Sequence, residues 1–466
     1  MSRSFARALI VLVALADATV FIVYQSPDWP TQWTDQAGYT RLGEALAKTG
    51  HFTRFPFYPR YVPEALRTPG YPAFVAVVNL TFGQGQLPVA LAQALVFAAI
   101  CLIAYATTRL FASDTVAFAA GLAVALFPPL PYFVALTLTE VFITFLVTAA
   151  IYSWLRALRH GGGWIVAAGA TLAAAALTRP SFQYLGVALA VFACLIAPCG
   201  RLAIRRSLLT LGVALLGVAP WIAYNVVYFD SVALSPPAAG VGRTLWEGSW
   251  QVALPGREQA TLTHLAETVW DRAALDRAVV AYASETGLDR EPMLRYVHEW
   301  QDVRKMWDAP TDPWQRVLAR IAADHEYGRL ARENIARDPV KHVWRRLTRG
   351  LALLWITEIP VRYTDINRLS TLAIRTIWLA QALLLAAAGV GLAVLWRSGA
   401  RTDAAAFAAL IVYVTAVHAV LYSEARYAMP AKPVILVLAT VAIARLCWTN
   451  APVADKLPPS QSQTEA

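Results

Sequence analysis

The sequence predicts an all-α polytopic membrane protein with about ten transmembrane helices. Of its 466 residues, 58% are hydrophobic and only 15% are charged, whereas about 25% of residues are charged in an average soluble protein. Apolar runs of about 18 to 25 residues recur along the chain, which is the length needed to cross a hydrocarbon core of about 30 Å. Lys and Arg gather in alternate connections between these runs. The bilayer is therefore the solvent in which the chain folds.

Ten apolar runs are candidates for spanning helices. They cover residues 8–24, 87–111, 115–130, 132–155, 164–177, 182–197, 207–229, 374–396, 404–422 and 434–448. The first run follows Arg3 and Arg7 and resembles a signal sequence, but the membrane protein behind it favours an uncleaved first helix. The four cysteines, Cys101, Cys194, Cys199 and Cys447, lie within or at the ends of these runs. No disulfide framework follows from that arrangement.

The net charge of +10 is explained by the loops. If the first helix runs from inside to outside, the cytoplasmic connections are those that carry Arg109; Arg156, Arg159 and His160; Arg201, Arg205 and Arg206; and Arg397 and Arg401. This agrees with the positive-inside rule and gives no reason to expect a nucleic-acid partner. Both termini are then cytoplasmic, and two polar regions, 25–86 and 230–349, face outwards.

Four parts of the chain are expected. An N-terminal membrane module (1–229) contains the outer loop 25–86. An extracytoplasmic helical subdomain (230–350) follows, with Leu262, Leu265 and Val269 at helical spacing and a helix start at 311–314. C-terminal membrane helices fill 351–448, where 351–356 is too short to span and is expected to be an interfacial helix. The polar tail 449–466 is expected to be disordered.

Asp35 is the first candidate catalytic residue. It lies in the first outer loop among Trp29, Trp33 and Tyr39, where partial burial would make its carboxylate a better base than a solvated one. The alternative is that Asp35 caps a helix over 36–48, because Thr34 and Asp35 stand where an N-cap is expected. Position and residue type alone leave both interpretations open.

Glu140 is the second candidate. Thr137, Glu140, Thr144 and Thr148 form one polar stripe on an expected helix over 136–155. An acid within a spanning helix costs roughly 2.5 to 3.5 kcal/mol on insertion scales and usually lines a cavity or meets a cation. Asp17 in the first helix raises the same question, and a structural pairing inside the bundle is the alternative for both acids.

Few cations are expected at the outer end of the membrane helices. They are Arg67, Arg179 and Arg426, whose guanidinium groups could hold a lipid phosphate; interfacial anchoring is the alternative. The chain has no Gly-rich phosphate loop, no His-Glu-x-x-His and no paired Cys-x-x-Cys, so neither a nucleotide, a flavin nor a dedicated zinc site is expected. A divalent cation bound by scattered acids through water is left open.

An ordered set of short motifs carries a resemblance to a known family. They are Asp35 with Tyr39; Arg-Thr-Pro-Gly-Tyr-Pro at 67–72; Thr139-Glu140; Thr178-Arg179-Pro180; Pro220-Trp221 with Asn225; Leu-Trp-Glu-Gly at 245–248; and Arg426-Tyr427 with Pro430. The set resembles the GT-C class of membrane glycosyltransferases, in particular the bacterial family 39 proteins related to protein O-mannosyltransferases and to the aminoarabinose transferase of lipid A. Gln36 and Thr68 depart from that pattern, where Glu and Pro are usual.

The resemblance implies a glycosyltransferase that moves a sugar from a polyprenyl-phosphate donor to an acceptor hydroxyl or lipid phosphate at the outer face of the bacterial inner membrane. The acceptor is a lipid, a glycan or a protein. Gln36, which replaces the usual Glu, weakens the case for a protein acceptor. Asp35 and Glu140 would be the catalytic residues. The residues expected at the donor phosphate are Arg179, Arg426, Tyr427 and Arg67, and those expected at the sugar or acceptor are Trp33, Tyr39, Tyr71 and Trp246.

Two other functions remain open at this point. A transporter or flippase of a lipid-linked glycan would also have many helices and acids in a cavity, although the chain shows no two related halves of the kind that many transporters have. A glycan ligase or polymerase would use the same residue types. The sugar, the acceptor, the prenol length and any metal dependence are not specified by the sequence.

Overall fold

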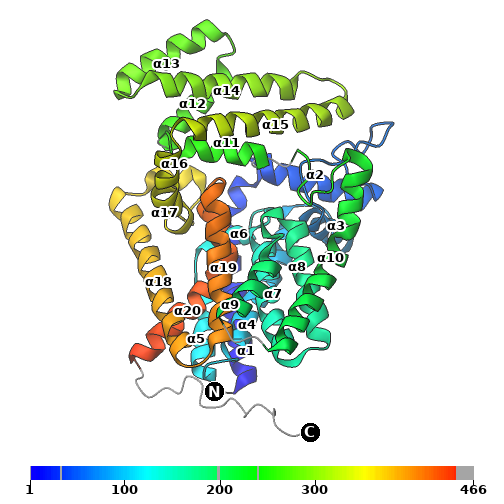
Figure 1. The fold of residues 1–466 in the computed structure, drawn as a ribbon, viewed down its shortest axis with the longest axis vertical. Coiled ribbons are helices and arrows are strands. Elements are labelled where there is room, and N and C mark those ends of the chain that lie inside the picture. Colours follow the sequence, from blue (N-terminus) through cyan, green and yellow to red (C-terminus); the bar gives the residue numbers. More distant parts are fainter. Residues whose placement is uncertain (1, 32–33, 197–199, 239–240, 255, 448–466) are drawn as a thin grey trace.

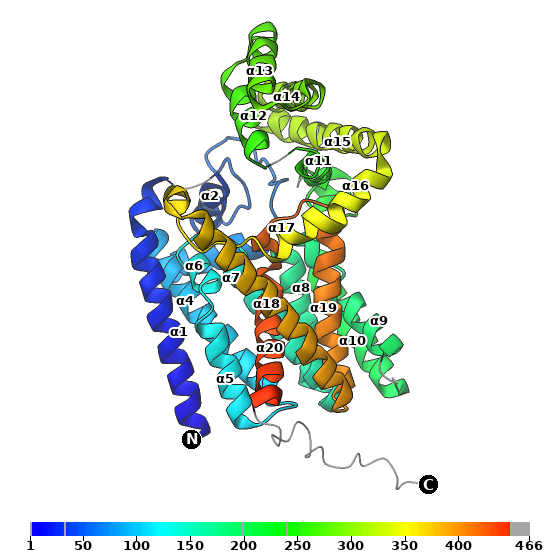
Figure 2. The ribbon, with the colours of Figure 1, turned by 90° about the vertical axis from the view of Figure 1, so that its left-hand side faces the viewer.

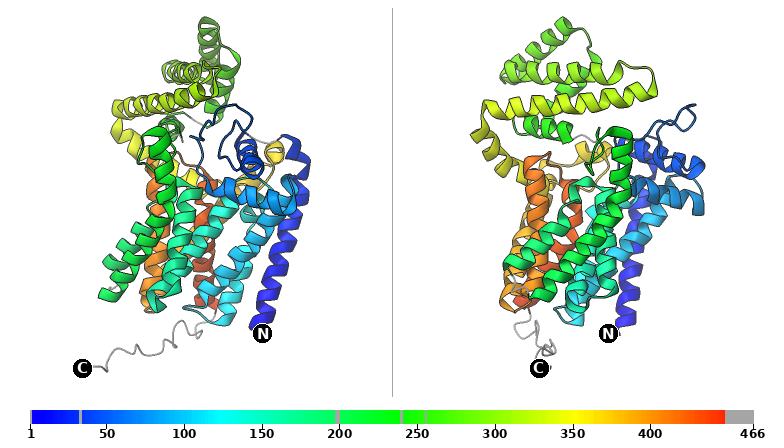
Figure 3. Two further views of the ribbon diagram at one scale, coloured as in Figure 1. Left: turned by 90° about the vertical axis from the view of Figure 1, so that its right-hand side faces the viewer. Right: turned by 45° about the vertical axis from the view of Figure 1, so that its right-hand side comes forward.

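The computed structural model describes residues 2–31, 34–196, 200–238, 241–254 and 256–447. These residues form helices and connecting loops and contain no strand. A bundle of long helices makes up one part of the molecule, and an upper layer of helices, α11–α15, lies across one end of that bundle (Figure 1). The N-terminus and the end of α20 lie at the opposite end, as Figures 2 and 3 also show.

Seven helical segments of the described residues are long and apolar enough to cross a membrane. Their helices are α1 (Arg3–Gln25), α4 (Gln86–Thr108), α7 (Glu140–His160), α10 (Arg201–Phe229), α18 (Thr371–Arg397), α19 (Arg401–Val420) and α20 (Lys432–Cys447), which continues the short helix η5 (Ala425–Ala431). Shorter apolar helices accompany them: α3 (Gly70–Phe82), α5 (Asp114–Ala125), α8 (Gly163–Thr178), and α9 (Leu185–Ile196) behind η2 (Pro180–Phe182).

Each of the ten predicted apolar runs corresponds to one of these helices. Seven coincide with the long helices, and the other three correspond to the shorter α5, α8 and α9. The all-helical membrane architecture is therefore confirmed, whereas a count of ten spans is not. The fourth short helix, α3, lies inside the region 25–86 that the sequence analysis treated as a polar outer loop.

The expected helix over residues 132–155 is interrupted. Three prolines, at 128, 129 and 131, precede or begin the short helix α6 (Pro129–Val134), and α7 starts only at Glu140. Glu140 therefore lies in the first turn of α7 and not in the middle of a span. The hydroxyls of Thr144 and Thr148 donate to the helix carbonyls four residues earlier, at 2.6 and 2.7 Å, so the threonine stripe is ordinary helix packing.

The upper layer has a hydrophobic cluster of its own. The upper layer consists of α11 (Val241–Gln251), α12 (Gly256–Thr268), α13 (Arg272–Thr286), α14 (Arg290–Asp308) and α15 (Pro313–Arg337). Its helices pack around a cluster that includes Trp246, Trp250, Leu262 and Met293. The start signal at 311–314 is confirmed, because Asp312 caps α15 by accepting from the Gln315 N–H. A descending segment of α16 (Pro339–Arg345), a π-helical turn η3 (Arg346–Gly350) and α17 (Leu351–Trp355) leads back to the bundle (Figure 2).

The remaining short elements fill the boundary between the bundle and the upper layer. They are η1 (Ser26–Thr31), α2 (Thr34–Thr49) and η4 (Tyr363–Arg368). Because α2 begins at Thr34, Asp35 lies inside its first turn rather than at the cap position. Cys199, Trp33 and the tail from residue 448 onwards, of which predictions were made, lie outside the described residues.

Candidate functional site

A cavity of about 460 Å³ opens between the bundle and the upper layer. Side chains of α2, the start of α7, the end of α8, α11, the end of α19 and η5 contribute to its wall. Its polar lining includes Asp35, Arg67, Thr178, Glu140, Arg179 and Arg426, and its apolar side includes Tyr184, Tyr413, Val417 and Val420. We call this the first cavity.

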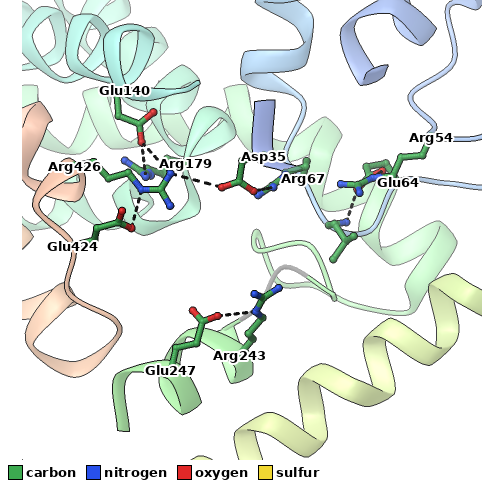
Figure 4. Close-up of polar contacts among 11 residues, drawn as sticks. Asp35, Arg54, Glu64, Arg67, Glu140, Arg179, Arg243, Glu247, Glu424 and Arg426 are labelled. Carbon is green, nitrogen blue, oxygen red and sulfur yellow. Dashed lines mark hydrogen bonds and ion pairs between the residues drawn. The ribbon is translucent and has the colours of Figure 1, made fainter. Parts of the chain in front are cut away.

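Acids and arginines alternate across the first cavity (Figure 4). Asp35 pairs with Arg67 and lies 3.7 Å from Arg426. Glu140 lies 3.4 Å from Arg179 and 4.0 Å from Arg426. The guanidinium group of Arg426 also donates to Glu424 at 2.8 Å. Arg426 therefore contacts all three carboxylates and connects the two halves of the cluster.

The pKa of Asp35 differs from what its aromatic surroundings suggested. Burial alone would raise it, but the guanidinium groups of Arg67 and Arg426 outweigh that effect and hold the pKa of Asp35 below its usual range. Asp35 is therefore a carboxylate at neutral pH. Its basicity is decreased, not increased, as long as both arginines stay beside it.

Gly70 allows two of the motifs to meet. A Cβ at this position would lie 2.5 Å from Thr178 Oγ1 and 2.8 Å from the carbonyl group of Leu177, so only glycine permits this close approach of α3 to the end of α8. The Thr68 hydroxyl donates to the Thr178 carbonyl at 3.3 Å. These contacts bring Arg67 and Arg179, which are far apart in the sequence, to the same cavity.

Gln36 brings the two acids to the same site. Its side chain is buried, and its amide oxygen accepts from the backbone N–H of Thr137 at 3.1 Å and from the Gln86 side chain at 3.3 Å. Thr137 lies in the turn just before α7, so this contact joins the start of α2 to the start of α7. Gln36, singled out above as a departure from the family pattern, thus has a structural contact that places Asp35 near Glu140.

Two tyrosine rings support the arginines. The guanidinium groups of Arg179 and Arg426 lie 4.5 and 5.3 Å from the ring centre of Tyr427, and the His418 ring stacks on the Tyr427 ring with 4.9 Å between the ring centres. Arg67 lies 4.8 Å from the ring centre of Tyr39. Such cation–π contacts hold the planar guanidinium groups without using their N–H donors.

Unsatisfied polar atoms concentrate around the first cavity. Five of its lining residues have a buried side-chain atom without a hydrogen-bond partner among the described residues: Arg67 Nε, Glu140 Oε2, Thr178 Oγ1, Arg179 Nη1 and Ser181 Oγ. Buried polar atoms are normally paired, so a group of exceptions in one place requires an explanation. A polar ligand in the cavity would supply the missing partners.

Comparison with known proteins gives a family match over part of the chain and a likeness of fold over nearly all of it. Residues 66–224 match the family described as dolichyl-phosphate-mannose-protein mannosyltransferase. The oligosaccharyltransferase AglB of Archaeoglobus fulgidus, solved with an inhibitory peptide and a dolichol-phosphate, superposes over 98% of this chain and 53% of its own, with a TM-score of 0.53 and 14% identity. Its apo form gives a TM-score of 0.53 at 15% identity over the same shares of the two chains. The chain thus spans about half the length of these archaeal enzymes.

The chain has the fold of the GT-C membrane glycosyltransferases. ArnT of Cupriavidus metallidurans bound to undecaprenyl phosphate also aligns, over 96% of this chain and 79% of its own at 15% identity, but its TM-score of 0.40 is too low to support the fold assignment, which rests on AglB. No curated protein sequence matches the chain. At these identities the structural likeness establishes the fold, and the activity has to be argued from the cavity.

Within this GT-C fold, most of the predicted site residues lie together. Asp35, Glu140, Arg67, Arg179, Arg426, Tyr427 and Tyr39 all line the first cavity. Tyr71 does not: it is fully buried behind Tyr39, with its hydroxyl donating to Gln93 at 3.1 Å. Trp246 is also away from the cavity, in the cluster of the upper layer, where its N–H donates to Glu299 at 2.6 Å. Asp17 is half-buried in α1 and does not line this cavity.

A charged pair lies close to the first cavity without lining it; the sequence analysis did not single out its arginine, whereas its acid, Glu247, belongs to the motif at 245–248. Arg243 on α11 pairs with Glu247 at 2.8 Å across from the Asp35 cluster (Figure 4). Arg243 lies in a polar region with many other cations, so nothing in the sequence distinguished it. Among the described residues there is no group of three or more His, Cys, Asp and Glu side chains suited to hold a metal.

Proposed function

We propose that the protein transfers a sugar from a polyprenyl-phosphate donor to an acceptor hydroxyl or lipid phosphate at the outer face of the bacterial inner membrane. The observation that carries the proposal is the first cavity, in which guanidinium groups and unsatisfied polar atoms gather beside apolar side chains of membrane helices. A lipid phosphate has the matching chemistry, a charged group attached to an apolar chain.

The lining of the cavity supports one orientation of the donor. Arg179 and Arg426 lie where its phosphate would be held, with Arg179 Nη1 free to donate a hydrogen bond. Tyr184, Tyr413 and Val417 would line the path of the prenyl chain. The acceptor would approach on the side of Asp35 and Tyr39, below α11 of the upper layer.

The reaction is a single displacement. Asp35 removes the proton of the acceptor hydroxyl, whose oxygen forms a bond to the anomeric carbon. The bond between that carbon and the phosphate oxygen breaks, and its electron pair remains on the polyprenyl phosphate as additional negative charge. Arg179 and Arg426 stabilise this charge as it develops, which is the usual action of preorganised cations in transfer reactions.

Donor binding would itself prepare Asp35. In the unliganded cavity Arg426 is shared among Asp35, Glu140 and Glu424. A donor phosphate that draws Arg426 away removes one of the two main interactions that lower the pKa of Asp35. The carboxylate then becomes a stronger base only when the donor is in place, which would limit proton removal to the productive complex.

The test uses the full-length protein in liposomes with a radiolabelled undecaprenyl-phosphate sugar and outer-membrane lipid as acceptor. Asp35→Asn should still bind undecaprenyl phosphate but should lose about two to four powers of ten in transfer rate. The matched control is Asp114→Asn, which changes an acid paired with Arg3 and Arg109 at the other end of the bundle. Transfer by Asp35→Asn at the rate of the control would overturn the assignment of the base.

A further inference from the structure

A second cavity of about 440 Å³ lies behind the wall of the first. The segment from Tyr422 to Arg426 separates the two, because Leu138, Tyr422 and Arg426 line both. The rest of its wall comes from α6, from α12, from the π-helical turn η3 with α17, and from the loop that follows α17. The proposed transfer reaction does not use this space.

The second cavity has one unpaired charge of each sign. Glu358 is 9% exposed and lines the cavity, and no described residue donates a hydrogen bond to its carboxyl group or forms an ion pair with it. Arg349 lines it from η3 and is likewise without an ion-pair partner among the described residues. The other two charged lining residues, Glu424 and Arg426, pair with each other at 2.8 Å.

The environment of Glu358 is consistent with a missing cation. Burial raises the pKa of Glu358 to about 7, and Glu424 and Glu140 act in the same direction, whereas Lys432 and Arg426 lower it. Lys432 donates instead to the Trp355 carbonyl and the Gln381 side chain, both at 3.2 Å. A buried carboxylate without a paired cation is costly, and an incoming ammonium group would relieve that cost.

Much of the remaining wall is apolar. Its apolar lining residues are Phe133, Leu136, Leu353, Ile359, Val361 and Ile366. Leu353 belongs to α17, the helix at which the descending segment of the upper layer reaches the membrane bundle (Figure 2). Apolar side chains together with a few separated charges suit a ligand that has both an alkyl chain and a charged headgroup.

We propose that the second cavity binds an amphiphile whose headgroup carries both a phosphate and a primary ammonium group. Arg349 would hold the phosphate through its guanidinium N–H groups. Glu358 would accept hydrogen bonds from the ammonium group, and the apolar walls would cover the start of the acyl chains. This inference concerns binding alone, so it does not depend on the proposed transfer reaction.

The experiment compares two probes on the full-length protein in detergent micelles. Dihexanoyl-phosphatidylethanolamine has both groups, and dihexanoyl-phosphatidylglycerol has the phosphate with hydroxyls in place of the ammonium. At pH 8 we expect the ethanolamine lipid to bind about tenfold more tightly, as for one charge-assisted hydrogen bond. Glu358→Gln should abolish this preference, and Arg349→Gln should weaken binding of both probes. Glu285→Gln, at an exposed position on α13, is the control and should bind as the unaltered protein does.

A second measurement needs no substitution. Because protonation removes the charge of Glu358, the preference of the unaltered protein for the ethanolamine lipid should decrease from pH 8 to pH 6. Equal affinity for the two probes at pH 8 would overturn the proposal. So would a preference that persists in Glu358→Gln, because the ammonium group would then be held elsewhere.

Discussion

Arginines control the titration of Asp35. The guanidinium groups of Arg67 and Arg426 both lower its pKa, so the acid limb of kcat/KM for transfer should lie below about pH 4, the usual range of an aspartate. Arg67→Ala removes one of these cations, which raises the pKa of Asp35 and moves the acid limb to higher pH. A pH–rate profile of both proteins measures the shift.

The informative quantity is the pH at the midpoint of the acid limb. The overall rate is less informative, because Arg67 is also expected near the donor phosphate and its loss could lower the rate at every pH. Arg277→Ala, at an exposed position on α13, is the control and should leave the limb in place. If Arg67→Ala lowers the rate equally at every pH, then Asp35 is not the group that titrates.

The candidate site could be predicted from single residues only in part. Acids and arginines that are costly at a membrane boundary stood out in the sequence, and Asp35, Glu140, Arg179 and Arg426 indeed lie around one cavity. Aromatic residues predicted the site less well, because an aromatic side chain can equally belong to a hydrophobic core, as those of Tyr71 and Trp246 do. The lowered pKa of Asp35 depends on Arg426, which is about four hundred positions away in the numbering of the chain. No local pattern in the sequence predicts a contact between residues so far apart in the chain.

Glu358 makes stability depend on pH. Its pKa of about 7 in the folded protein lies above the usual value of about 4.3, so between these values the folded state keeps a proton that the unfolded state has lost. The stability that this proton contributes to the folded state is therefore lost as the pH rises through this window, by at most about 4 kcal/mol. Glu358→Gln does not titrate, so its unfolding temperature should exceed that of the unaltered protein at pH 8 but not at pH 4.5. A difference in unfolding temperature between the two proteins that is the same at pH 8 and at pH 4.5 would contradict this explanation.

At the scale of elements, the contact of α3 with α8 depends on one missing side chain. Gly70→Ala would force a Cβ to within 2.8 Å of the Leu177 carbonyl group, so α3 has to move away and take Arg67 with it. We expect a loss of stability of about 1 to 3 kcal/mol and a larger loss of transfer than of folding. Gly212→Ala on α10 is the matched control, because its Cβ meets nothing within 4 Å. Thermal unfolding and transfer rates of the two variants test the prediction.

Arg346 joins three elements above the cavities. Its buried guanidinium group donates to the carbonyls of His418, Ala419 and Leu421 at the end of α19, to Gln251 on α11, and to the hydroxyl of Ser423. Ser423 directly precedes the segment that carries Glu424 and Arg426. The descending segment of the upper layer therefore fixes the wall between the two cavities.

Arg346→Ala should leave the carbonyls of Ala419 and Leu421 without their side-chain donor, at a cost of about 1.5 to 3 kcal/mol for each charged hydrogen bond that is not replaced. The Gln251 side chain and the His418 carbonyl keep their hydrogen bonds with Ser423. Because Arg426 is displaced together with its segment, KM for the donor should rise more than kcat falls. Arg346→Lys keeps the charge and some of the hydrogen bonds, so it should restore part of the affinity. A purely structural role would instead lower the amount of active protein with KM unchanged.

The order of helices could be predicted far better than their lengths. Hydropathy alone located every long span, since an apolar run has few other uses in a chain of this composition. It did not show that α5, α8 and α9 are short, nor that α7 begins at Glu140, although the prolines at 128, 129 and 131 mark the interruption before α7. The apolar helix α3 was missed because at 13 residues it is well below the length of a span.

The arrangement of charge over the whole molecule predicts its orientation. Arg3, Arg109 and Arg159 lie at the end of the bundle opposite the upper layer, where they pair with Asp114 and Asp403. By the positive-inside rule we expect this end to be cytoplasmic, so that the two cavities and the upper layer would face outwards. A lipid-linked donor would then reach the first cavity from the outer leaflet.

Two cysteine variants test this orientation, each in a chain whose four native cysteines are replaced by serine. Ser284→Cys, exposed on α13 of the upper layer, should react with a membrane-impermeant maleimide in intact spheroplasts. Ser4→Cys, exposed at the start of α1, should react only after lysis. The two positions carry the same substitution, so a difference in labelling reports the side of the membrane and not the chemistry of the thiol. The reverse pattern would place the cavities in the cytoplasm, where the proposed outer-leaflet donor could not reach them.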